Sequence, residues 1–167
     1  MGKPYLLVDN QGGRIDFSLS HARGCVACAL GQDLDVGVDV DVLDESFEIA
    51  QFSGVFSSAE FDELRALGSS KARVERFLTL WTLKEAYSKA TGQGLSNPFY
   101  DLSFSVSECG TVTIRTPNET GTGRDRWHFA LASPTQNHRL AVAARAPIED
   151  SCCFDLKPLE SAECLFD

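Results

Sequence analysis

The sequence predicts an α+β protein whose strands pair largely antiparallel. Strand-like and helix-like segments fall in separate blocks, with strands first, helices in the middle and strands again towards the end. The 167 residues are 43% hydrophobic and 23% charged, which is typical of a globular chain of one domain or two small half-domains. The formal net charge of −9 disfavours a binder of nucleic acid or of an anionic membrane, because both need a basic face.

The hydropathy pattern predicts a soluble, cytoplasmic protein. No apolar run approaches the roughly 20 residues that span a bilayer. The first residues, Met1 to Pro4, lack the charged-then-apolar pattern of a signal peptide.

The first strands and the helices have distinct local signals. Residues 15–20, 25–30 and 36–42 alternate apolar and polar positions or are rich in β-branched residues, which predicts three strands. Ser57 and Glu60 have the spacing of a capping box, which predicts a helix that runs to Leu67 and ends at Gly68.

A longer helix is predicted from about residue 72 to residue 90. Phe77 and Trp81 lie at helical spacing and are expected in the core, and Gly92 follows as a C-cap. Alternating segments then predict strands at residues 102–106, 112–114, 127–132 and 140–144.

Charge is segregated along the chain. Residues 33–63 contain ten acids and neither lysine nor arginine. Residues 65–89 contain six bases and two acids, a local net charge of +4; the bases are Arg65, Lys71, Arg73, Arg76, Lys84 and Lys89. Such runs are usually solvated faces, but here they predict a cation-binding acidic cluster beside a strip suited to an anionic partner.

Asp39 and Asp41 form the sharpest local signal. Two carboxylates separated by one strand residue share a face, while Val38 and Val40 occupy the opposite face. Such carboxylates repel unless a cation lies between them, and hard oxygen ligands favour Mg²⁺, with Mn²⁺ as the second choice. An edge strand with a polar outer face explains the motif equally well.

Two weaker signals accompany this pair. Glu85 and Lys89 lie four residues apart on one helix face, which alone indicates no more than a surface ion pair. Ser20 and His21 end a strand, where a lone histidine is more often structural than catalytic. Neither signal assigns a function alone.

Together these segments resemble the 4'-phosphopantetheinyl transferase superfamily, and most closely its larger, pseudo-dimeric, surfactin-synthetase-activating type. The family patterns G-K-P, F-N-x-S-H-S, G-[IV]-D-[IV]-E and W-[ST]-x-K-E-[AS]-x-x-K-x-x-G-x-G correspond to segments beginning at Gly2, Phe17, Gly37 and Trp81. The resemblance implies a cytoplasmic transferase that uses magnesium. Its substrate would be coenzyme A, and it would modify a serine of an acyl or peptidyl carrier protein in fatty acid, polyketide or nonribosomal peptide synthesis.

The resemblance also implies roles for individual residues. Asp39, Asp41 and Glu85 would hold the magnesium ion, and Glu85 and Lys89 would be the catalytic residues. The phosphates of coenzyme A would be bound by Lys3, Ser20, His21 and Lys89. Docking of the carrier protein is expected at the basic strip, through Arg65, Lys71, Arg73 and Arg76.

The sequence departs from the family pattern in its organisation. We expect residues 1–35 to be a remnant of the first half-domain with phosphate-contacting strands, 36–146 the main transferase half-domain, and 147–167 an acidic tail. We therefore expect an incomplete N-terminal pseudo-repeat, with self-association as a reasonable substitute for the missing cover. Asp41 stands where the family more often has glutamate, and Ala22 replaces a serine.

Two other functions compete with the transferase. One is a relic that binds carrier protein or nucleotide without turnover. The other is a metal-dependent phosphohydrolase, which uses similar carboxylates but leaves the matches at Lys3, Ser20, His21 and Lys89 unexplained.

Overall fold

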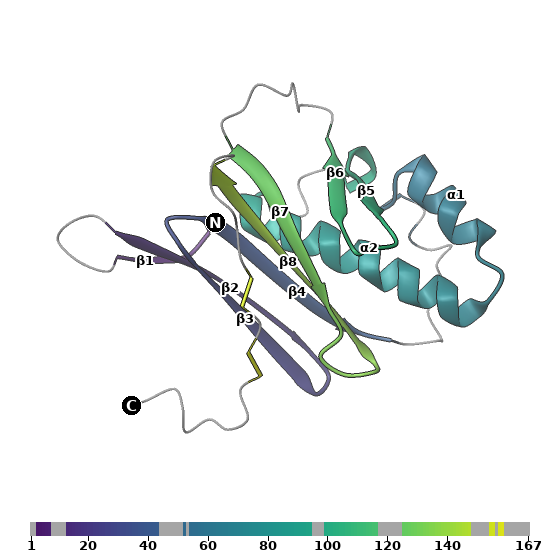
Figure 1. Ribbon diagram of the computed structural model, residues 1–167, viewed down its shortest axis with the longest axis horizontal. Helices are drawn as coiled ribbons and strands as arrows, with labels where there is room; N and C mark the ends of the chain where they lie inside the picture. Colours follow the sequence, from purple (N-terminus) through teal and green to yellow (C-terminus); the bar gives the residue numbers. More distant parts are fainter. Residues whose placement is uncertain are drawn as a thin grey trace.

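The chain folds into two three-stranded antiparallel sheets, a short hairpin and two helices (Figure 1). The computed structural model describes residues 3–7, 13–43, 52, 54–94, 99–116, 125–147, 154–155 and 157–158. The first sheet has the order β1-β2-β3, with β1 (Tyr5–Leu7), β2 (Arg14–Ala22) and β3 (Cys25–Gln32). The second has the order β4-β8-β7, with β4 (Asp35–Val42), β7 (Asp125–Ala132) and β8 (His138–Pro147). The hairpin pairs β5 (Ser103–Val106) with β6 (Val112–Arg115).

This architecture confirms the predicted α+β class with antiparallel pairing. Each predicted strand is present with shifted ends, and β1 and a 3-10 turn, η3 (Phe99–Asp101), are additional. No helix in the described part of the chain is both long and apolar enough to cross a membrane. Most of the predicted tail, 147–167, lies outside the described residues.

Helix α1 begins at the predicted capping box and α2 ends at the predicted Gly92, whereas α1 ends one residue before the predicted Leu67 and α2 begins two residues before the predicted start. Helix α1 (Ser58–Ala66) starts with a complete capping box, in which the Glu60 carboxylate accepts the Ser57 N–H at 2.9 Å. Helix α2 (Ser70–Thr91) ends at Gly92, whose φ of 69° is the left-handed conformation that glycine adopts without strain. Phe77 is buried in the core as expected, and Trp81 is half-buried against it.

The β4-β8-β7 sheet is the middle layer of the molecule. Strand alternation directs Val38 and Val142 into an apolar cluster shared with Ala27 of β3. The opposite face packs on α2, where Ala143 joins Ala86 in the main core. The odd-numbered residues of β4, including the two aspartates, therefore face the helix side of the sheet.

Gly37 allows β4 and α2 to approach at backbone distance. A Cβ at this position would lie 2.0 Å from the Ala86 carbonyl oxygen and 2.5 Å from the Ala90 nitrogen. The close approach brings the strand that carries Asp39 against the helix that carries Glu85 and Lys89.

Replacing Gly37 by alanine is therefore expected to force β4 away from α2. We expect a loss of about 1–3 kcal/mol in the free energy of unfolding, the usual cost of overpacking, measured by urea denaturation. Gly68→Ala is the matched control, because a Cβ there would meet no atom within 4 Å. Equal stability of the two variants would contradict the close-packing role of Gly37.

Two serines of β2 cover the edge of β4. The Ser18 hydroxyl accepts the Val38 N–H at 3.1 Å, and the Ser20 hydroxyl accepts the Val40 N–H at 3.3 Å. Because residues two apart share a strand face, both hydroxyls point towards β4. This contact joins the two sheets beside Asp39.

Candidate active site

Asp39 lies where β2, β4 and the last turns of α2 meet. Its side chain is 9% exposed, and its Oδ1 atom accepts a hydrogen bond from the Ser20 hydroxyl at 2.8 Å. The same oxygen lies 2.8 Å from the Lys89 ammonium. The structure thus brings together three residues that are far apart in the sequence.

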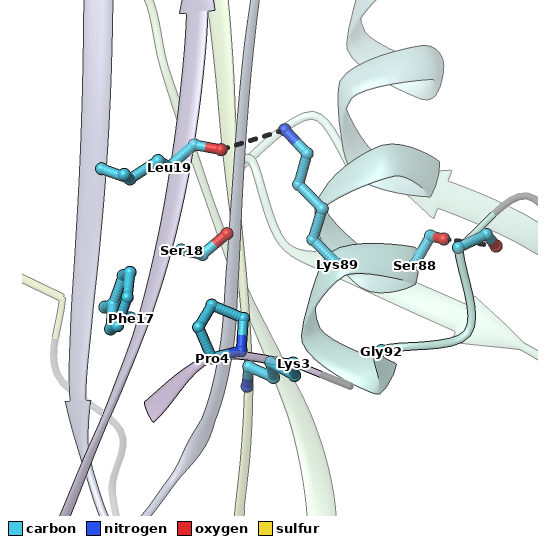
Figure 2. Close-up of a pocket in the computed structure, with 9 residues that line it drawn as sticks. Lys3, Pro4, Phe17, Ser18, Leu19, Ser88, Lys89 and Gly92 are labelled. Atoms are coloured by element: carbon cyan, nitrogen blue, oxygen red, sulfur yellow. Dashed lines mark hydrogen bonds between the residues drawn. The ribbon is translucent and has the colours of Figure 1, made fainter. Parts of the chain in front are cut away.

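Lys89 reaches from α2 to both neighbouring strands. Its ammonium donates to the Val38 carbonyl at 3.1 Å and to the Leu19 carbonyl at 3.5 Å, in addition to Asp39. Figure 2 shows the lysine spanning the gap from the helix to Leu19. These three acceptors match the three donors of an ammonium group.

The carboxylates of the site are buried and carry neighbouring like charges: Asp39 acts on Glu85, and Asp41 acts on Asp39. Burial raises the pKa of Glu85, the nearby Asp39 charge raises it further, and Lys89 opposes the shift. Burial also raises the pKa of Asp39, against the lowering effect of its contacts with Lys89 and Ser20. The charged form of each carboxylate is therefore disfavoured, and a bound cation would stabilise it.

Asp41 lies on the same face of β4, two residues beyond Asp39. Its carboxylate accepts the Val42 N–H at 2.8 Å. Among the described residues, no three histidine, cysteine, aspartate or glutamate side chains lie close enough to form a metal-binding group. The side chains nevertheless fit magnesium chemically, because Asp39, Asp41 and Glu85 carry hard carboxylate oxygen atoms, and a neighbouring carboxylate charge raises the pKa of both Asp39 and Glu85.

An open cavity of about 370 Å³ lies beside Lys89. Figure 2 shows Lys3 and Pro4 near Gly92 at the end of α2, with Lys89 and Leu19 further along the same side of the helix. The lining residues are Lys3, Pro4, Phe17, Ser18, Leu19, Ser88, Lys89, Gly92 and Gly94. Sequence reasoning assigned no role to Phe17, Ser18 or Ser88, although all three lie within or beside the quoted motifs.

The predicted phosphate-binding residues are only partly brought together. Lys3 and Lys89 line the same cavity, where Lys3 is held by Asp16 at 3.5 Å and Asp35 at 3.7 Å. Ser20 turns its hydroxyl to Asp39. His21 is exposed, and strand alternation places it on the opposite face of β2 from Ser20.

Only two of the four bases of the predicted docking strip are exposed, and the other two make contacts within the fold. Arg65 and Lys71 are exposed. Arg73 instead donates to the Leu67 carbonyl at 2.9 Å, and Arg76 pairs with Glu63 at 2.8 Å. Two of the four residues predicted to dock the carrier protein are thus already engaged within the fold.

Lys84 was predicted as one of the six bases near the strip, but it is buried and adds no charge to the surface. Its side chain is 0% exposed and pairs at 2.8 Å with Glu60, which is 1% exposed. The ammonium also donates to the carbonyls of Phe99 and Leu102. Lys84 is therefore a core residue that ties α2 to α1 and to the segment before β5.

The geometry agrees with a comparison against known families. The sequence profile of the 4'-phosphopantetheinyl transferase superfamily matches residues 35–143, which include β4, both helices and most of β8. The chain belongs to this superfamily. This membership confirms the resemblance drawn from the motifs.

Individual members of the superfamily resemble the chain over most of its length. The 4'-phosphopantetheinyl transferase of Bacillus subtilis is 28% identical over 149 residues, which cover 87% of this chain and 61% of that protein. The L-aminoadipate-semialdehyde dehydrogenase-phosphopantetheinyl transferase of Rattus norvegicus is 29% identical over 161 residues, covering 87% of this chain and 52% of that protein. The chain thus spans about half to three-fifths of the length of these relatives.

The fold has a counterpart among solved structures. A holo-(acyl-carrier-protein) synthase from Bacillus anthracis, solved in complex with CoA (3',5'-ADP), superposes with a TM-score of 0.55 at 20% identity. The match covers 66% of this chain and 94% of that chain. The similarity confirms the predicted fold.

Proposed function

We propose that the chain transfers 4'-phosphopantetheine from coenzyme A to a serine of an acyl or peptidyl carrier protein, and that it needs magnesium to do so. The observation that carries the proposal is the convergence of Asp39, Glu85 and Lys89 beside the cavity that Lys3 also lines. Superfamily membership supports the same reaction class.

The side chains of the site have complementary tasks in this reaction. Glu85 has a raised pKa beside the Asp39 carboxylate, which suits it to accept the proton of the carrier serine directly or through water. Lys89, at the rim of the cavity, would offset the charge of the departing adenosine 3',5'-bisphosphate. Ser20 keeps Asp39 oriented through the 2.8 Å hydrogen bond.

The proposed metal would be held by Asp39, Asp41 and Glu85. Magnesium bound there would neutralise charge on the pyrophosphate of coenzyme A. The further phosphate contacts that we propose come from Lys3, Ser20, His21 and Lys89. For Ser20 this contact requires its single O–H to turn from Asp39 to the phosphate. For His21 it needs a substrate that reaches the outer face of β2.

Chromatography of the nucleotide products tests the proposed reaction against its two rivals. With coenzyme A and magnesium, we expect adenosine 3',5'-bisphosphate to appear only when a carrier protein is added. Release of phosphate or nucleotide without a carrier would favour a phosphohydrolase. Binding of coenzyme A without any product would favour the relic.

We expect the carrier protein to dock at the exposed part of the basic strip. Lys71 precedes Glu85 by 14 residues, about 21 Å along the helix axis at 1.5 Å per residue. Reversing Arg65 or Lys71 to glutamate should raise the KM for an acidic carrier up to about fivefold, the worth of an exposed ion pair near 1 kcal/mol. The KM for coenzyme A should not change, and the effect should shrink with added salt.

Steady-state kinetics with Arg115→Glu provide the matched control for Arg65→Glu, because Arg115 is exposed on β6. Arg73 and Arg76 are unsuitable for this test, since reversing either would break contacts within the fold. An equal rise in the carrier KM for Arg65→Glu and Arg115→Glu would remove the docking role of the strip.

Self-association through the first sheet is a separate expectation. Seven large hydrophobic side chains are exposed among the described residues, and six of them lie on this sheet: Tyr5, Leu6, Leu7, Leu19, Val26 and Leu30. Patches of this kind commonly mark interfaces. Light scattering is expected to give at least the mass of a dimer, and Val26→Lys should lower it; a monomeric parent chain would contradict the expectation.

A further inference from the structure

Lys89 supplies the positive charge that Asp39 faces in the ligand-free chain. Its ammonium has three acceptors, and one of them, Asp39 Oδ1, also accepts the Ser20 hydroxyl. This oxygen atom therefore already receives two hydrogen bonds. The lone pairs with which Oδ1 itself could ligate a metal ion are therefore engaged.

A metal ion and the ammonium cannot both use this oxygen without strong repulsion. Magnesium binds carboxylate oxygens at about 2.1 Å, whereas the ammonium lies 2.8 Å from Oδ1. Two cations on one oxygen atom would thus be less than about 5 Å apart, where like charges repel by several kcal/mol in a partly buried site. A metal ion that ligates Oδ1 therefore requires the ammonium to leave this oxygen atom.

Lys89 is able to move, because its side chain is 31% exposed and lines the open cavity. Figure 2 shows the side chain at the edge of that cavity. An anion that enters the cavity would offer the ammonium new acceptors in place of Asp39.

We infer that Lys89 competes with the metal ion for Oδ1 of Asp39, so that a divalent cation binds this oxygen atom only when the Lys89 ammonium has left it. The inference rests on the proposed function for its metal and deepens it by assigning Lys89 a second role. Metal binding frees the lysine for a phosphate group, and phosphate binding frees the carboxylate for the metal. The two ligands therefore favour each other's binding, as linkage requires.

Titration of the chain with Mn²⁺ alone, followed by electron paramagnetic resonance of the free ion, tests the competition directly. Lys89→Met is expected to bind Mn²⁺ at least about tenfold more tightly than the parent chain. Lys157→Met removes the same charge from a residue that is 77% exposed and pairs with Asp155, and it should bind Mn²⁺ as the parent does. Affinity of Lys89→Met equal to or weaker than that of the parent would overturn the inference.

A second measurement uses the parent chain and so does not depend on the folding of the variant. Lysines carrying ¹³C-methyl groups give separate resonances, and the Lys89 signal is assigned by its loss in Lys89→Arg. We expect Mg²⁺ to shift this signal, and an unmoved signal at saturating Mg²⁺ would overturn the inference. If the parent chain shows no transferase activity but Lys89→Met still binds Mn²⁺ more tightly, the competition is supported and the proposed function is rejected.

Discussion

Replacing Glu85 by glutamine is expected to lower the rate of phosphopantetheinyl transfer by about 10²- to 10⁴-fold, the usual contribution of a general base. Glutamine has a similar shape, but it neither accepts the serine proton nor carries negative charge towards a metal ion. The measurement is kcat with a saturating carrier protein. Activity near that of the parent would remove Glu85 from the mechanism.

The same substitution is expected to stabilise the ligand-free fold at pH 7. Because the folded-state pKa of Glu85 is raised above its ordinary value of 4.5, the folded chain holds this proton longer than the unfolded chain does. Stability is therefore lost as the pH rises from about 4.5 through the raised pKa, and Glu85→Gln should lack this loss. Urea denaturation of the parent chain and of Glu85→Gln at pH 4 and pH 7 measures this pH dependence of stability. If Glu85→Gln loses stability as well as activity, Glu85 instead has a structural role.

Replacing Lys84 by methionine is expected to cause the largest loss of stability of any change considered. The Glu60 carboxylate would remain buried without its cation, although it still accepts the N–H groups of Ser57 and Phe104. Breaking one side of a buried ion pair costs about 3–5 kcal/mol, a large part of a total stability of about 5–15 kcal/mol. The change in the free energy of unfolding is again measured in urea.

A double variant separates charge from packing at this site. Glu60→Gln together with Lys84→Met removes both charges and keeps an oxygen atom that accepts the Phe104 N–H. We expect this pair to recover part of the lost stability, because no uncompensated charge is left in the core. A double variant as unstable as Lys84→Met alone would show that shape, not charge, decides the stability.

Local patterns predicted most of the fold. Alternation located the strands, the capping box of Ser57 and Glu60 located α1, and Gly92 located the end of α2. Strand β1 escaped prediction because Tyr5–Leu7 is three residues long and exposed throughout, so it shows no alternation. Its pairing with β2 is a tertiary contact without a local signal.

Strand and helix periodicity predicted which residues of the candidate site share a face, but not the contacts between the elements. Strand period placed Asp39 and Asp41 on one face, and helix period placed Glu85 and Lys89 on another. The contact of Lys89 with Asp39 joins residues 50 positions apart, and that of Ser20 with Asp39 joins residues 19 positions apart. Neither contact has a sequence signal, which is also why Lys84 was counted as a surface base.

The most direct test of the central claim is tandem mass spectrometry of a carrier protein incubated with the purified chain, coenzyme A and magnesium. Glu85→Gln, purified in the same way, controls for any transferase carried over from the expression host. The proposed function predicts one phosphopantetheinyl group on the acceptor serine with the parent chain and almost none with Glu85→Gln. An unmodified serine with the parent chain, or equal modification by both chains, would contradict it.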